Sequence, residues 1–172
     1  MDKVKETKDV LFKESQRFTQ WWLGILMFGI SVLPLYGIMQ QLVFKEPWGD
    51  KPMPDWGLIV YAAGTAALVY FIYAINLRTW IHPDAIQVSF PPFFRKKRFS
   101  IREIASAEVV TYGFVGYGLR ISLKYGTVYN IKGNKGLAII MKNGKKYMIG
   151  TQHPAQVAEV VKHLLARNVT NP

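Results

Sequence analysis

Hydrophobic and polar residues follow three patterns along the chain, and each pattern predicts a different kind of structure. The first pattern is a pair of long uncharged stretches, one between Arg17 and Lys45 and one between Asp55 and Arg78. Each stretch contains an apolar run of roughly 20 residues, the length that a helix needs to cross the hydrocarbon core of a bilayer. These runs give a predicted transmembrane hairpin, residues 21–77, and its two spans, residues 21–42 and 56–77.

The second pattern is an alternation of apolar and polar residues, which is typical of half-buried strands. It is clearest over residues 86–90, 119–123 and 137–141. Asn143-Gly144 then predicts a two-residue hairpin turn, because both positions tolerate a positive φ. Residues 79–151 as a whole are expected to form about seven short strands.

The third pattern has helical spacing and closes the chain. Five apolar residues recur on one face of a predicted helix that follows Pro154: Val157, Val160, Val161, Leu164 and Leu165. Several strands followed by one amphipathic helix fit a small antiparallel β-barrel, with the helix covering an open end. The predicted fold class is therefore an α+β membrane protein, with the transmembrane hairpin followed by a soluble domain at residues 78–168.

The distribution of charge predicts how the hairpin is oriented. Residues 1–20 contain five Lys/Arg and four Asp/Glu, residues 45–55 contain two and three, and residues 78–172 contain fifteen and four. Segments that flank membrane spans and are rich in Lys and Arg stay on the cytoplasmic side. We expect both termini in the cytoplasm, with residues 1–20 forming an N-terminal tail. That tail is either a helix on the membrane surface or a frayed lead-in to the first span.

The order of these elements resembles a known family. The segment Gly136–Thr151, running into Pro154 and an amphipathic helix, is similar to the bacterial PH-like domain, and so are residues 81–88 and 98–104. That domain often follows two transmembrane helices in bacterial proteins of unknown function. The resemblance implies a seven-strand PH-like barrel with a C-terminal helix, anchored as a multi-pass protein in the bacterial cytoplasmic membrane. The turn at His82–Ala85 is tight and slightly acidic, unlike the basic loop of phosphoinositide-binding PH domains.

Aromatic residues beside consecutive cations make residues 90–98 the most suggestive surface segment. Each cation near an anionic leaflet contributes about 1 kcal/mol to membrane association. The alternative is a hairpin tip whose charges are solvated, and the sequence does not decide between them. The candidate lipid-contact residues are Phe93, Phe94, Arg95, Lys96, Lys97 and Arg98.

A loop rich in glycine and aromatic residues, 112–118, is a second candidate contact. Its glycine spacing differs from that of the dinucleotide-binding fingerprint, and no helix follows it to bind a phosphate. A long turn is the simpler interpretation, and a partner-binding loop is the functional one. The candidate partner-contact residues are Tyr112, Phe114 and Tyr117.

Composition argues against several kinds of chemistry. The chain has no cysteine, which excludes disulfides and thiolate catalysis. His82, His153 and His163 lack metal-ligand spacing, and the carboxylates form no pair suited to acid–base work. We therefore expect no enzyme activity, no cofactor and no bound metal. No nucleic-acid motif accompanies the basic residues, and a membrane anchor would make the leaflet the nearest polyanion, so no nucleic acid is expected either.

The remaining function classes are two kinds of membrane-associated module. The first is a non-enzymatic interaction module on the cytoplasmic face, which binds a membrane-protein partner or associates with itself as a homo-oligomer. The second is a sensor of anionic lipid or envelope stress that uses residues 90–98 to contact membrane lipids. The sequence favours the first and leaves the second open.

Overall fold

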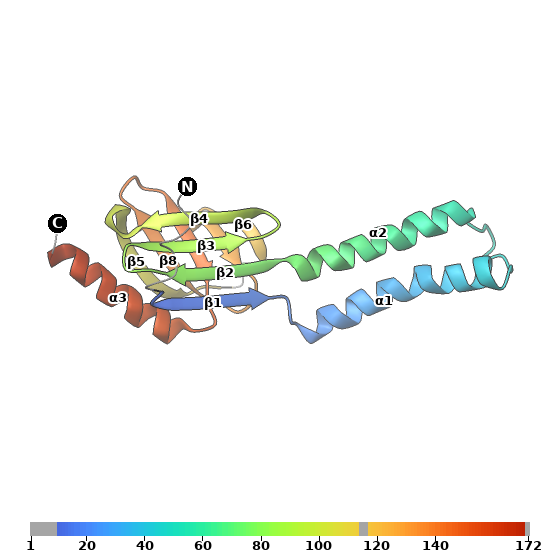
Figure 1. Cartoon of the computed structure of the whole chain (residues 1–172), viewed down its shortest axis with the longest axis horizontal. Helices are drawn as coiled ribbons and strands as arrows, with labels where there is room; N and C mark the ends of the chain where they lie inside the picture. Colours follow the sequence, from blue (N-terminus) through green and yellow to red (C-terminus); the bar gives the residue numbers. More distant parts are fainter. Residues whose placement is uncertain (1–9, 114–116, 171–172) are drawn as a thin grey trace. The chain divides into compact units, whose positions relative to one another are not determined.

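The computed structural model describes residues 10–113 and 117–170. The chain divides into two compact units, shown in Figure 1. One unit is Phe18–Ala74, here called the helical hairpin. The other unit combines the segment ending at Arg17 with the segment that starts at Ile75, and is here called the β domain.

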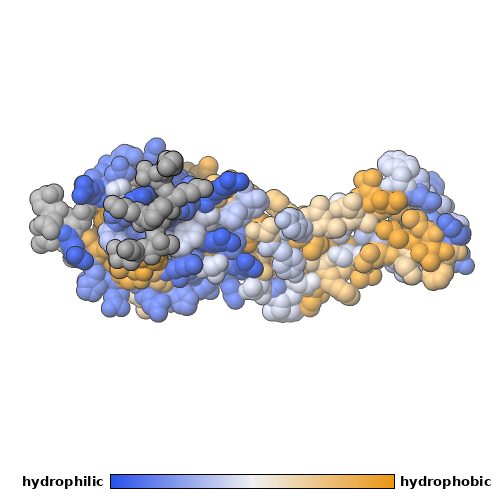
Figure 2. All heavy atoms as spheres, in the orientation of Figure 1, coloured by the Kyte–Doolittle hydropathy of each residue, from blue (hydrophilic) through white to orange (hydrophobic). Residues whose placement is uncertain are grey.

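The helical hairpin contains two long apolar helices. Helix α1 (Trp21–Ile38) continues into a π-helical turn, η1 (Met39–Val43), and helix α2 covers Asp55–Ala74. By length and composition both helices can span a membrane, and few of their side chains are buried. Figure 2 shows hydrophobic residues gathered over this unit and hydrophilic residues over much of the β domain.

The second helix ends earlier than the sequence pattern predicts. Residues 56–77 were expected to be one span, but α2 stops at Ala74 and Asn76 already begins strand β2 (Asn76–Ile81). Leu77 is fully buried in the β domain, which accounts for an apolar residue at this position outside the helix. The part of the β domain that follows the helical hairpin thus starts at residue 75 rather than residue 78.

The segment before α1 is a strand, not the tail expected for residues 1–20. Strand β1 (Phe12–Arg17) pairs antiparallel with β2, and Arg17 lies opposite Asn76. The helical hairpin is therefore an insertion between two neighbouring strands of one sheet. Residues 1–9 lie outside the described part of the chain.

The first sheet, sheet A, has the order β1-β2-β3-β4 with every pair antiparallel. Strand β3 covers Ala85–Phe90 and strand β4 covers Phe94–Ser100. Every residue of β3 is buried, including the polar Gln87 and Ser89, so both of its faces are covered. The alternation at residues 86–90 therefore correctly predicted a strand but not its burial on both sides.

The second sheet, sheet B, follows a short 3₁₀ turn, η2 (Ile101–Glu103), and has the order β5-β8-β9-β7-β6. Strands β7 and β9 are parallel, and all other neighbours are antiparallel. Its strands are β5 (Ile104–Thr111), β6 (Gly118–Ser122), β7 (Gly126–Asn130), β8 (Lys135–Met141) and β9 (Lys146–Gly150).

The two sheets pack against each other through aromatic side chains. Phe90 and Phe94 of sheet A contact Tyr129 of sheet B, with ring centroids 6.5 and 5.2 Å apart. Phe99 contacts Tyr147 in the same way at 4.8 Å. Helix α3 (Pro154–Thr170) contacts β5 and β8 and buries Val157, Val161 and Leu164, as its helical spacing predicted.

The α+β class and the C-terminal helix are confirmed, but the single closed barrel of about seven strands is wrong. The described residues form nine strands in two sheets, and no backbone ladder joins β4 to β5 or β6. The sheets are linked across the core by side chains instead. The domain therefore keeps four edge strands: β1 and β4 in sheet A, and β5 and β6 in sheet B.

Buried polar side chains fasten β1 to the segment before α3. The Gln16 side-chain amide donates to the Gly150 carbonyl over 2.7 Å. The Glu14 carboxylate accepts a hydrogen bond from the Thr151 hydroxyl at 2.6 Å and another from the Gln152 backbone N–H at 2.7 Å. Because buried polar groups need partners, this network fixes the position of β1 in the domain.

Candidate interaction surfaces

The predicted lipid-contact segment does not act as one surface. Phe93 is half exposed and stacks on Phe90, with centroids 5.3 Å apart. Phe94 instead points between the sheets and contacts Tyr129. Of the two aromatic residues, only Phe93 presents a ring that a membrane or partner could reach without a change in packing.

The cations of this segment also have different surroundings. Lys97 turns inward: its Nζ donates to the Tyr129 hydroxyl at 3.3 Å and lies 4.2 Å from the centroid of the Tyr147 ring. Burial raises the pKa of Tyr129, and the Lys97 hydrogen bond opposes that shift. Lys97 therefore serves mainly to join the two sheets.

A β-bulge directs the other cations outward. The register between β3 and β4 shifts between Val88 and Phe90, which leaves Arg95 and Lys96 together opposite Ser89. Both side chains are exposed. Arg98 is also exposed and forms an ion pair with Asp84, which lies in the turn that precedes β3.

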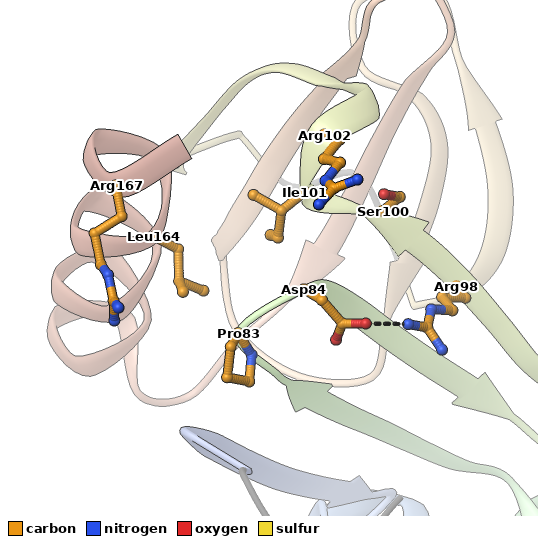
Figure 3. A pocket seen from close by; sticks show the side chains of 8 residues that line it. All are labelled: Pro83, Asp84, Arg98, Ser100, Ile101, Arg102, Leu164 and Arg167. Carbon is orange, nitrogen blue, oxygen red and sulfur yellow. Dashed lines mark hydrogen bonds and ion pairs between the residues drawn. The ribbon is translucent and has the colours of Figure 1, made fainter. Parts of the chain in front are cut away.

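A cavity of about 510 Å³ lies beside this ion pair (Figure 3). The Asp84–Arg98 pair lies on one side of the cavity, Arg102 lies on η2, and Arg167 lies on α3 at the other side. Three guanidinium groups and one carboxylate give the cavity an excess of positive charge. The full lining is Pro83, Asp84, Arg98, Ser100, Ile101, Arg102, Leu164 and Arg167.

This arrangement is suited to an anionic group with an apolar part. Guanidinium groups bind phosphate and carboxylate through paired N–H donors. Ile101 and Leu164 are buried side chains that contribute an apolar wall. The sequence analysis placed Arg98 among the candidate lipid-contact residues but did not identify Arg102 or Arg167. Arg167 lies on a helix, 65 positions after Arg102, and no local motif marks it.

The glycine–aromatic loop is only partly a surface feature. Tyr112 is buried and packs on Val128 and Met148 at the face of sheet B that is turned away from sheet A. Burial raises its pKa, the Arg120 charge opposes that shift, and Tyr117 adds to it. Tyr117 is exposed, whereas Phe114 lies outside the described residues.

Strand β6 carries an apolar surface that the sequence pattern placed in the interior. Leu119, Ile121 and Leu123 alternate with polar residues as expected, yet all three are exposed. The exposed fraction of Ile121 is 87%, and Leu123 is fully exposed. The polar neighbours Arg120 and Ser122 are partly buried on the opposite face. Alternation identified the apolar face of β6 but could not show that these side chains are exposed among the residues that the structure describes.

Metal-binding chemistry has no candidate centre in residues 10–113 and 117–170. No group of three or more His, Cys, Asp or Glu side chains there could hold an ion. His82, His153 and His163 lie on a turn, before α3 and on α3 respectively. The expectation that the protein uses no cofactor stays a prediction.

Comparisons with known proteins do not identify a family for the chain. No protein-family model matches it, and no curated protein matches it. The resemblance to the bacterial PH-like domain therefore stays a hypothesis that rests on residues and element order.

Proposed function

We propose that this protein is a membrane-anchored interaction module whose β domain binds a protein partner or a second copy of itself on the cytoplasmic face. The observation that carries this proposal is the exposed apolar face of β6. Large apolar side chains gathered on an otherwise polar domain mark an interaction site. Leu119 and Ile121 of β6, with Leu123 just after it, form such a group on an edge strand of sheet B.

The anchor is the helical hairpin, and strand pairing supports its two-span arrangement. Because β1 and β2 are hydrogen-bonded neighbours, they lie on the same side of any membrane. The chain between them must then cross the membrane an even number of times, and α1 and α2 provide two crossings. The excess of Lys and Arg in the β domain favours the cytoplasmic side.

The PH-like relationship is part of this proposal. Two packed, mainly antiparallel sheets followed by a C-terminal helix support it. The strand that precedes the hairpin and the parallel β7–β9 pair are features that a comparison within that family would need to explain. On this view the domain belongs to a bacterial cytoplasmic membrane protein whose role is binding rather than catalysis.

The first test is the native mass of the full chain, released from its membrane in a mild detergent. We expect a complex that contains more than one polypeptide. Alkali extraction should leave the protein in the membrane fraction. Since the chain has no cysteine, a single cysteine at Asp50 should react with an impermeant thiol reagent from outside, and one at Lys142 should not. A native mass equal to that of one chain, with no partner bound, would overturn the proposal of an interaction module.

A second function, recognition of an anionic lipid or metabolite, is favoured by the arginine cavity. Arg98, Arg102 and Arg167 line the cavity from three separate elements, so the fold rather than a local motif brings these arginines to one cavity. The test is titration of the full chain in neutral detergent with a short-chain anionic phospholipid and, separately, with inorganic phosphate. Arg102→Gln and Arg167→Gln should each weaken binding, while the exposed control Lys132→Gln should not. Equal binding by all three variants would exclude this cavity.

A further inference from the structure

Three of the four edge strands have a feature that blocks further pairing. Natural sheets protect their edges with bulges, charges or covering segments. Strand β1 carries the exposed cations Lys13 and Arg17 and contacts α3. Strand β4 has a bulge and the exposed cations Arg95 and Lys96. Strand β5 has a register shift after Ile104 and contacts α3.

Among the described residues, strand β6 has no bulge and no covering segment, and its one charged residue, Arg120, is partly buried on the face away from Leu119 and Ile121. Its register with β7 is regular from Gly118 to Ser122, with no bulge and no proline. Its polar residues point to one face, and its other face presents Leu119 and Ile121, followed by Leu123. A regular, exposed, apolar edge is the kind of strand that another strand extends.

We propose that β6 pairs antiparallel with β6 of a second copy, with Ile121 directly opposite Ile121 of that copy. This inference deepens the proposed function, on which it rests, by naming the partner and its contact. The two sheets B would then form one continuous sheet across a two-fold axis, the symmetry of most homodimers. Leu119 of each copy would lie opposite Leu123 of the other.

The sequence of β6 favours this register over its neighbours. Centred on Ile121, the pairing places Arg120 opposite Ser122 and Gly118 opposite Lys124, so no like charges face each other. Centred on Arg120, it would place that arginine opposite itself. Centred on Ser122, it would place Arg120 opposite Lys124. A slip by one residue would put apolar side chains opposite polar ones. Like charges directly opposite destabilise a strand pair.

Anchoring increases the effect of a contact of this size. One strand pair buries less surface than the roughly 1,600 Å² of a typical stable interface. Two copies in one membrane are confined to the same layer, which raises the effective concentration of each β domain for the other. The proposed contact is therefore expected in the full-length protein in membranes and, at high protein concentration, in mild detergent.

Cysteine cross-linking of the full chain in membranes tests the contact directly. Opposite residues in an antiparallel pair have Cβ atoms about 4.5–5.5 Å apart. Ile121→Cys should therefore give a covalent dimer with a short thiol cross-linker. The matched control is Ile140→Cys, an exposed isoleucine on β8 in the interior of the same sheet, which should not. Equal cross-linking of both variants would overturn the proposal.

A charge-pair experiment tests the register. In the variant L119E/L123E, glutamates of the two copies would face each other, and the dimer should weaken by about tenfold or more. In L119K/L123E each lysine would face a glutamate, and the dimer should recover. If both variants behave alike in native mass and cross-linking, the register centred on Ile121 is wrong.

These outcomes separate the inference from the function on which it rests. If the native mass shows an assembly but Ile121→Cys does not cross-link, the β6 contact is wrong and the interaction module stands. If the protein is monomeric and its Ile121→Cys thiol is shielded from reagents, another segment of the chain or lipid covers β6, and self-pairing is overturned. If the protein is monomeric with an accessible thiol and holds no partner, both proposals fail.

Discussion

Glu14 and Thr151 lie 137 positions apart in sequence and share a hydrogen bond of 2.6 Å, with the Thr151 hydroxyl donating to the Glu14 carboxylate. The exposed fraction of Glu14 is 6%, so its charge is held almost out of water. The same carboxylate accepts the Gln152 N–H just before α3 begins, at a position where a helix N-terminus favours negative charge.

The variant Glu14→Leu tests the role of this carboxylate in holding β1 to the domain. It would leave the Thr151 hydroxyl and the Gln152 N–H without their acceptor, and we expect a loss of about 2–4 kcal/mol in the free energy of unfolding. Urea titration of the full chain in mild detergent, followed by protease sensitivity of the β domain, measures this loss. Glu159→Leu, on an exposed position of α3, should change stability by less than about 0.5 kcal/mol. Equal effects would show that the network contributes nothing.

Tyr112→Phe should be neutral or stabilising at neutral pH. The Tyr112 hydroxyl is buried without a hydrogen-bond partner among the described residues, and such a group is unfavourable. Burial also raises its pKa above the ordinary value of 10.0. As the pH rises through that value, the unfolded state releases the proton first, so wild-type stability should fall. Unfolding titrations at several alkaline pH values should show a smaller fall in Tyr112→Phe. A fall of equal size in both proteins would contradict this assignment.

Lys97→Met should destabilise the β domain, although Lys97 belongs to a run of four cations. The change removes the hydrogen bond to Tyr129 and the cation–π contact with Tyr147, with an expected loss of about 1–2 kcal/mol. It should also raise the pKa of Tyr129 further, which a spectrophotometric pH titration against Tyr129→Phe would detect. Arg95→Met is the matched control, and we expect a change below about 0.5 kcal/mol because Arg95 is exposed. If the two variants lose equal stability, Lys97 does not join the sheets.

Gly126→Ala and Gly144→Ala separate backbone strain from steric overlap. Both glycines have positive φ, +67° and +79°, so alanine is strained at either position. A Cβ at Gly126 would also overlap the Lys146 carbonyl oxygen, whereas a Cβ at Gly144 would meet no atom within 4 Å. We expect about 1 kcal/mol of destabilisation for Gly144→Ala and at least twice that for Gly126→Ala. Thermal unfolding of both variants measures the difference, and equal losses would mean that β7 and β9 separate easily.

Local sequence patterns predicted the elements whose apolar residues face the core. The helical spacing of Val157, Val161 and Leu164 occurs as predicted, because local geometry determines it. A turn also forms at Asn143-Gly144, but the Met141 N–H donates to the Lys145 carbonyl and only Gly144 has a positive φ, so the loop is longer than the predicted two residues. Patterns could not reveal β1, whose inward face is Phe12, Glu14 and Gln16. Two of these three residues are polar and form hydrogen bonds with partners more than 130 positions away, so the apolar–polar alternation typical of a strand is absent.

The candidate surfaces were harder to predict than the elements for a related reason. A run of four cations has no internal sign that Lys97 turns inward, since the direction depends on a bulge opposite Ser89. The apolar alternation in β6 is the same whether a strand is covered or lies at an edge. Its exposure depends on the strand order of sheet B, which arises from pairings between distant segments.

The pairing of β1 with β2 has a consequence for how the protein is made. Strand β1 is synthesised before the helical hairpin and its partner β2 after it, so in the proposed membrane arrangement sheet A remains incomplete until insertion is under way. If only one helix inserted, β1 and β2 would be left on opposite sides of the bilayer and could not pair. In that arrangement, folding of the β domain would depend on insertion of both helices: a hairpin with both helices inserted would allow β1 and β2 to pair, and one with a single inserted helix would leave sheet A without β1.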